Sequence, residues 1–108
     1  MLELTATLIQ RDVIRYTPSG MPLIDCVLHH TSELSEAGQS RQVELEAPAI
    51  AFESVALRLA NSRLDETYRF TGFVANRSRK SKRTVFHIVR FESIEASTNE
   101  TPRDPVAD

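Results

Sequence analysis

The sequence contains no tryptophan and little cysteine, glycine or proline: 1 Cys, 3 Gly and 5 Pro among 108 residues. So few glycines and prolines exclude collagen-like and low-complexity chains. The single Cys26 cannot form an internal disulfide, and its place in an apolar alternation predicts a buried thiol. No segment approaches the roughly 20 apolar residues of a membrane-spanning helix, and no basic-then-apolar leader opens the chain. We therefore expect a cytoplasmic protein.

Motifs for catalysis and for metal binding are also missing from the sequence. It has no glycine-rich phosphate loop, no nucleophile elbow and no HExxH motif. His29 and His30 do not have metal-ligand spacing, because adjacent residues of a strand point to opposite faces, and His87 stands apart. The adjacent acids Asp65 and Glu66 fall in a predicted turn, where acids are common. We therefore predict a protein that is not an enzyme and needs no cofactor.

The residues that are present have an ordinary globular composition and an uneven distribution of charge. Hydrophobic residues make up 41% and charged residues 26%, and the length suits one domain. The net charge of −2 argues against a generic nucleic-acid binder, but residues 76–83 hold five of the thirteen basic side chains. Such a patch attracts phosphates whatever the total charge, because salt screens fields beyond about 10 Å. Residues 92–108, by contrast, carry more acidic than basic side chains.

Alternation of apolar and polar residues predicts strands over most of the chain. The expected strands cover residues 2–14, 23–31, 41–47, 68–75 and 84–94. Ile9 breaks the alternation of the first strand, which predicts a long bent strand with a bulge. In the third strand we expect Val43, Leu45 and Ala47 to face the core and Glu44 and Glu46 to face outward.

The connections between these strands complete the predicted fold. A turn is expected at residues 17–20, a hairpin loop at 32–39, and an end of the third strand at Pro48. Residues 49–60 change to a helical period. Three strands, a helix and two strands predict an all-β, five-stranded OB-fold barrel with a short helix between strands 3 and 4; a swapped α+β arrangement is the alternative. The domain spans residues 1–95, and residues 96–108 are expected to be a disordered acidic tail.

Two segments carry the residue types that bind nucleic acid. OB-folds hold oligonucleotides on their second and third strands and on the loops joining strands 1–2 and 4–5. The basic segment 76–83 falls in the 4–5 loop, where mobile cations can follow a phosphate backbone; the alternative is a solvated hairpin tip. Arg15 and Tyr16 precede the 1–2 turn, where the phenol ring either stacks on a base or packs against the barrel end.

Several of these segments resemble a known family. Residues 16–22 and the strand through Val27-Leu28 resemble the second-strand signature of the bacterial single-stranded-DNA-binding OB-fold proteins, and the primosomal branch of that family is the closer match. The supporting segments are Glu36-Ala37-Gly38 with Arg41-Gln42, Leu45-Glu46-Ala47-Pro48-Ala49, Thr71-Gly72-Phe73 and the basic loop. The resemblance covers about residues 2–95.

The resemblance implies a homodimer of two OB-folds that binds single-stranded DNA in replication restart. It also implies the primosomal DNA helicase, and possible other primosome proteins, as partners. Arg15 matches a basic DNA contact before the turn, and residues 77–83 match the basic loop. The predicted DNA-binding residues are Arg15, Tyr16, His30, Arg41, Arg77, Arg79, Lys80, Lys82 and Arg83.

The sequence also departs from this family pattern. Some members carry aromatic residues on and before the third strand, where this chain has Gln39, Gln42, Glu44 and Glu46. Stacking is then left to Tyr16, Phe73 and Phe86, although each of the three is expected rather in the core or the dimer interface. Two alternatives therefore stay open: a general single-stranded-DNA-binding protein, and an OB-fold protein adaptor with weak DNA binding. The sequence does not discriminate DNA from RNA.

Overall fold

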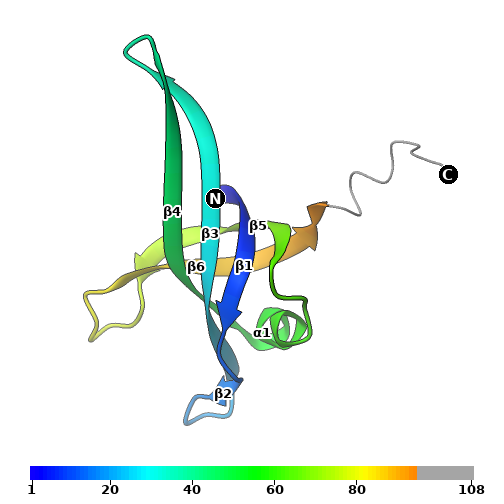
Figure 1. Cartoon of the computed structure of the whole chain (residues 1–108). Coiled ribbons are helices and arrows are strands. Elements are labelled where there is room, and N and C mark those ends of the chain that lie inside the picture. The colour runs from blue at the N-terminus through cyan, green and yellow to red at the C-terminus, as the bar shows by residue number, and fades with distance from the viewer. Residues whose placement is uncertain (95–108) are drawn as a thin grey trace, which may run out of the picture.

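Long strands close into a barrel in the computed structural model, which describes residues 1–94 (Figure 1). The elements in chain order are β1 (Leu2–Arg11), β2 (Arg15–Tyr16), β3 (Pro22–Glu36), β4 (Gln39–Phe52), α1 (Glu53–Ala60), β5 (Glu66–Asn76) and β6 (Thr84–Ser93). The predicted acidic tail, residues 96–108, lies outside the described residues. Within residues 1–94, no helix is both long and apolar enough to cross a membrane.

The barrel is a ring of β1, β5, β6, β4 and β3 that closes through pairing between β3 and β1. Neighbouring strands are antiparallel except β4 and β6, which pair in parallel over three residues. A bulge between Leu8 and Gln10 bends β1, so that its first part pairs with β5 and its end with β3. This arrangement confirms the predicted OB-fold, its helix between strands 3 and 4, and its bent first strand. The structure adds only the two-residue β2, which pairs with the start of β3.

The core explains why the alternating sequence folds in this way. Side chains of alternate residues on each strand point into the barrel, and the largest fully buried ones are Leu8, Ile24, Leu28 and Phe70, joined by Leu59 of α1. Helix α1 covers one end of the barrel with Ala56 and Leu59 (Figure 1). The helix begins at Glu53 and not at residue 49 as predicted, because Ala49 and Ala51 extend β4 and lie in the core.

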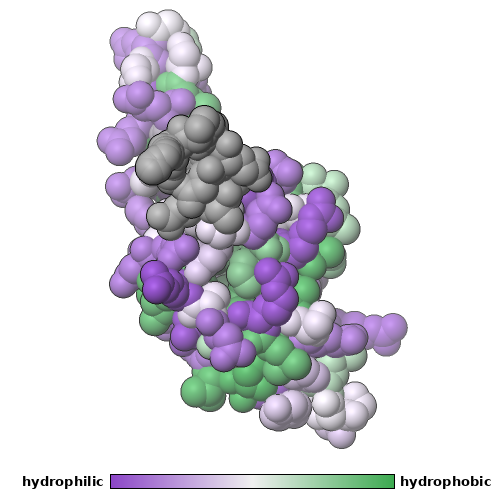
Figure 2. All heavy atoms as spheres, turned by 90° about the vertical axis from the view of Figure 1, so that its right-hand side faces the viewer, coloured by the Kyte–Doolittle hydropathy of each residue, from purple (hydrophilic) through white to green (hydrophobic). Residues whose placement is uncertain are grey.

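The hairpin between β3 and β4 is much longer than the sequence indicated. The predicted loop at 32–39 is wrong: the two strands pair from Leu23 and Phe52 as far as Glu36 and Gln39. Only Ala37 and Gly38 form the turn, both with positive φ, as in a two-residue hairpin turn. Residues 30–45, here called the arm, project beyond the barrel, and hydrophilic side chains dominate the arm in Figure 2.

Pro48 was predicted to end the third strand, and the structure places it inside β4. At this residue β4 has a neighbour only in β3, because pairing with β6 begins at Ala49. A proline is tolerated there because it need not donate to a second strand. The predicted inward face of Val43, Leu45 and Ala47 is also wrong in part. These residues point to the core side, but the arm has no core beneath it, and Leu45 is 48% exposed.

Smaller differences concern the ends of strands. The first strand ends at Arg11 instead of residue 14, and the chain then turns through residues 12–21, here called the β1–β3 loop, which contains β2. The alternation along residues 68–75 predicts that Val74 shares one face with Tyr68, Phe70 and Gly72. In the structure Val74 is exposed and lines an apolar depression with Leu2 and Leu45.

Candidate nucleic-acid interface

The outer face of β3 and β4 continues across β6 and β5. Cross-strand partners share a face of a sheet, so pairing shows which side chains belong together. Asp25 of β3 pairs with Ile50 of β4, Ile50 pairs with His87 of β6, and His87 pairs with Phe73 of β5. The β1–β3 loop borders this face on one side, and residues 77–83, here called the basic loop, project from the barrel beside it (Figure 1).

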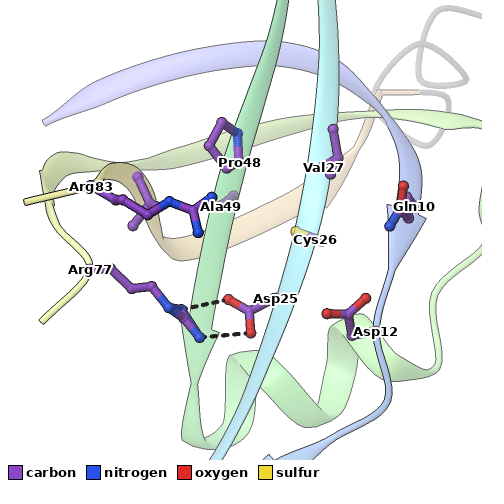
Figure 3. Close-up of a pocket in the computed structure, with 10 residues that line it drawn as sticks. Gln10, Asp12, Asp25, Cys26, Val27, Pro48, Ala49, Arg77 and Arg83 are labelled. Carbon is purple, nitrogen blue, oxygen red and sulfur yellow. Dashed lines mark hydrogen bonds and ion pairs between the residues drawn. The ribbon is translucent and has the colours of Figure 1, made fainter. Parts of the chain in front are cut away.

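Asp25 forms ion pairs with two of the predicted DNA-binding arginines. Arg77 donates from Nη1 to Oδ1 at 2.8 Å and from Nη2 to Oδ2 at 3.0 Å (Figure 3). Arg15 donates from Nη2 to Oδ2 of the same carboxylate. A single anion thus joins the β1–β3 loop and the basic loop, and it neutralises cations that the sequence had assigned to phosphate. Nothing local in the sequence indicates this, because Asp25 lies 10 positions from Arg15 and 52 positions from Arg77.

A solvent-open depression surrounds this ion-pair cluster. Asp12 and Asp25 lie on one side of it, and Arg77 and Arg83 reach into it from the basic loop (Figure 3). The loop is closed at its base, because the backbone N–H of Arg77 donates to the carbonyl of Arg83 at 2.8 Å. The depression therefore brings cations from the loop over acids of β3 and the β1–β3 loop.

The remaining cations of the basic loop are differently placed. Arg79, Lys80 and Lys82 are exposed towards its tip, and no ion pair holds them in the part of the chain that the structure describes. These three side chains keep their full charge and long flexible stems. They are the cations best placed to follow a mobile phosphate backbone.

The other predicted site residues are spread around the barrel. Tyr16 is 65% exposed in β2, beside Arg15, so its ring is free to stack. Arg41 lies near the tip of the arm and pairs with Glu36 at 3.1 Å. The Nδ1 of His30 lies 2.7 Å from the carbonyl of Thr5 and donates to it, because a carbonyl oxygen only accepts. His30 therefore ties the arm to β1, and its contact with DNA stays a prediction.

A row of three rings lies on the outer face, and the sequence indicated only one of them. Phe73 is 43% exposed and stacks on His87, with ring centroids 4.9 Å apart and planes 7° apart. His87 stacks in turn on Phe52 at 6.3 Å and 18°. Phe86, the other candidate, is buried in the core. Phe52 and His87 were missed because strand register, which no local pattern specifies, brings the rings together.

Acidic residues share this face of the sheet. Glu46 and Glu44 continue the outward series from Ile50 along β4 into the arm, and both are exposed. In the part of the chain that the structure describes, no ion pair offsets either glutamate, so this stretch of the strand surface is anionic. The cations that could attract phosphate therefore lie on the loops and not on this stretch of the sheet.

Cys26 lies directly beneath this face, inside the barrel. Burial raises the pKa of its thiol to about 12, with smaller contributions from the carboxylates of Asp25 and Asp12. The predicted buried thiol is confirmed, and a thiol with this pKa does not act as a nucleophile near neutral pH. No cluster of three or more potential metal ligands occurs among residues 1–94.

Comparisons with known proteins agree with the fold and with the resemblance. The model of a family described as another single-strand binding protein family matches residues 1–90. The replication restart protein PriB of Bordetella pertussis is 35% identical over 101 residues, which make up 94% of each chain. That of Neisseria gonorrhoeae is 34% identical over 88 residues, covering 82% of this chain and 87% of its own.

Solved structures lead to the same group. A PriB structure from Ralstonia solanacearum, 38% identical, has a TM-score of 0.76 and covers 85% of this chain and 94% of that one. The single-stranded DNA binding protein of Thermus aquaticus shares the fold at 19% identity, with a TM-score of 0.67 over 83% of this chain and 47% of that one. The chain therefore belongs to the PriB family of OB-fold single-strand-binding proteins.

Proposed function

We propose that this protein binds single-stranded DNA without turnover, as an accessory protein of the replication-restart primosome. The observation that carries the proposal is the basic loop, whose free cations stand beside the outer face of β3 and β4. Because β2 is an addition, β3 and β4 are the second and third strands of the OB-fold, and the basic loop joins its fourth and fifth strands. OB-folds hold oligonucleotides at these strands and at this loop. The names of its PriB relatives, which are replication restart proteins, support the process in which it acts.

Phosphate contacts supply most of the binding energy in this proposal. Arg79, Lys80 and Lys82 bind phosphates of a flexible strand, and Tyr16 and Phe73 offer exposed rings to bases. Such contacts recognise a single strand with little sequence preference, because every base has a face that can stack. Duplex DNA does not offer its bases in this way.

The direct test is fluorescence anisotropy with a labelled dT oligonucleotide at several salt concentrations, with duplex DNA and RNA of the same length as controls. We expect binding to the DNA single strand that weakens steeply with salt, at a slope of roughly −0.7 per phosphate neutralised. Absence of binding even at low salt would contradict the proposal. Equal binding to RNA would widen it to single-stranded nucleic acids in general.

An OB-fold protein adaptor is the second candidate function. The acids Asp25, Glu44 and Glu46 on the outer face favour it, because they oppose phosphate where DNA would lie. In both candidates the partner is the primosomal DNA helicase, and only in the first does the protein itself bring the helicase to exposed template. A pull-down with the helicase, with and without a single-stranded oligonucleotide, separates them. Capture that does not change on adding DNA, from a protein that binds no DNA, favours the adaptor.

A homodimer belongs to this proposal, and two observations support it. Residues 2–6 of β1 pair only with β5, and apart from the Thr5 carbonyl, which accepts from His30, the other edge of this segment is open to a second chain. The exposed side chains of Leu2, Leu45 and Val74 surround an apolar depression beside that edge. Pairing of two β1 strands covers both the edge and the apolar surface.

A further inference from the structure

The strongest unassigned feature of the outer face is one carboxylate that holds arginines from two separate loops. Asp25 is in the middle of the face, Arg15 comes from the β1–β3 loop, and Arg77 begins the basic loop. Both loops belong to the part of the fold that borders bound oligonucleotides in OB-folds. The ion pairs are therefore formed within the proposed path of the DNA.

The geometry of these ion pairs is that of arginine bound to an oxyanion. The two Nη atoms of Arg77 reach the two oxygens of Asp25 at 2.8 and 3.0 Å, a bidentate pairing. The planar guanidinium group makes the same paired hydrogen bonds to a phosphate. A carboxylate at this position is thus a stand-in for a phosphodiester, supplied by the protein itself.

The cluster is also accessible to a competing anion. The side chains of Asp25 and Arg77 are 26% and 29% exposed, and that of Arg15 is 49% exposed. A solvent-open depression, lined also by Arg83, reaches the cluster (Figure 3). Because the cluster is in contact with solvent, an incoming phosphate can reach both arginines and compete with the carboxylate for them.

We propose that Asp25 occupies a phosphate subsite between the two loops, and that DNA gains Arg15 and Arg77 only by displacing this carboxylate. The inference rests on the proposed function and deepens it. Asp25 then weakens binding of single-stranded DNA, because its carboxylate repels the incoming phosphate unless it moves away from the arginines. The unbound protein in turn keeps both loops tied to β3.

The opposing view is that the ion pairs are only a tether for the loops. Removing the Asp25 charge then lowers stability and leaves DNA affinity unchanged or weaker. The subsite predicts the reverse for affinity. The sign of the change in affinity therefore decides between the two.

The test is the Asp25→Asn variant of the full chain, titrated by anisotropy with labelled dT of about 30 nucleotides, since one OB-fold covers at most about 16. The amide keeps the shape and one hydrogen-bond acceptor but removes the charge. We expect binding about fivefold tighter at low salt, the effect of one like charge about 4 Å from a phosphate in a watery site. The salt slope becomes steeper by roughly 0.7 for each further phosphate that is neutralised.

The matched control is Glu92→Gln. Glu92 pairs with Arg69 at 2.6 Å on the same two strands as the basic loop, but at the opposite end of the barrel. It undergoes the same change of charge away from the proposed path. An equal gain in both variants would reduce the effect to net charge and overturn the subsite.

A double-mutant cycle tests whether the gain in DNA affinity depends on Arg15 and Arg77. In an Arg15→Gln, Arg77→Gln background, Asp25→Asn is expected to gain no more than Glu92→Gln does. Should Asp25→Asn fail to fold, Asp25→Ser removes the same charge with a smaller side chain. An unchanged or weaker affinity of a folded Asp25 variant, with a wild-type protein that binds DNA, overturns the subsite alone. Failure of both proteins to bind at low salt overturns the proposed function with it.

Discussion

The ring of Phe73 lies parallel to the imidazole of His87, 4.9 Å away, on the outer face of β5 and β6. The two residues are direct cross-strand partners, and the far side of the histidine ring stacks on Phe52. A stack of three rings is thereby held by the strands, with Phe73 as its exposed member, beside loops that carry cations.

If a base stacks on this surface, Phe73→Ala weakens binding of single-stranded dT by about 1–3 kcal/mol, the usual contribution of one stacked base. Anisotropy titration measures the loss, and Phe73→Tyr retains most of the affinity. Leu57→Ala on α1 is the control, because it removes a similarly exposed apolar side chain away from the face. Equal affinity of Phe73→Ala and wild type removes the ring from the site.

Replacing Arg79, Lys80 and Lys82 together by Ala is expected to weaken binding to dT and dA oligonucleotides alike. Phosphate binding carries no sequence information, so the affinity falls uniformly. The salt slope falls in magnitude by about 2, or roughly 0.7 for each phosphate that is no longer neutralised. The control replaces Arg63 and Arg90, two exposed cations outside the basic loop, by Ala, and we expect it to keep the wild-type salt slope. Unchanged affinity of the triple variant excludes the basic loop.

Gly72→Ala is expected to destabilise the barrel through a steric clash. A Cβ at this position lies 1.9 Å from the carbonyl oxygen of His87 on β6, closer than any real contact. Relief requires movement of the backbone, and we expect a loss of about 1–3 kcal/mol in the free energy of unfolding by urea. The control is Ser54→Ala, a change at an exposed position of α1. Wild-type stability of Gly72→Ala would show that β5 and β6 can move apart at this position without loss of stability.

The Cys26 thiol is expected to resist thiol reagents in the folded protein. Its pKa rises from 9.0 to about 12, which makes the thiolate about a thousandfold scarcer at pH 8. The pKa of the thiol is higher in the folded than in the unfolded protein. The stability that the protonated thiol contributes is therefore complete below pH 9 and is lost as the pH rises towards 12. Reaction with Ellman's reagent, with and without urea, measures this. Equal rates in both conditions would contradict it.

Val74→Asp is expected to weaken self-association, since it places a charge in the apolar depression beside the open edge of β1. Sedimentation equilibrium of variant and wild type measures the change in dimer dissociation. Leu57→Asp adds the same charge to an exposed apolar position of α1 and is expected to leave the dimer intact. A wild-type protein that is monomeric at all concentrations would rule out the homodimer.

Features that depend on neighbouring residues were predictable. The period of two, the bulge signalled at Ile9 and the change to a helical period identified the elements, and their order specified the OB-fold. The basic loop was found because its five cations lie within seven residues, 77–83. Errors arose where the pattern was correct but its surroundings were unknown: Leu45 alternates like a core residue, although the arm has no core beneath it.

The sequence by itself determined the order of strands and helix and where the cations gather, because these follow from local periodicity and composition. Only the tertiary structure decided which charges and rings meet. Asp25 forms ion pairs with Arg15 and Arg77, which lie 10 and 52 positions away in the sequence. Phe73 contacts His87 because the register of β5 and β6 makes them cross-strand partners. Such pairings depend on how the closed barrel aligns its strands, and a linear pattern of side chains does not contain that alignment.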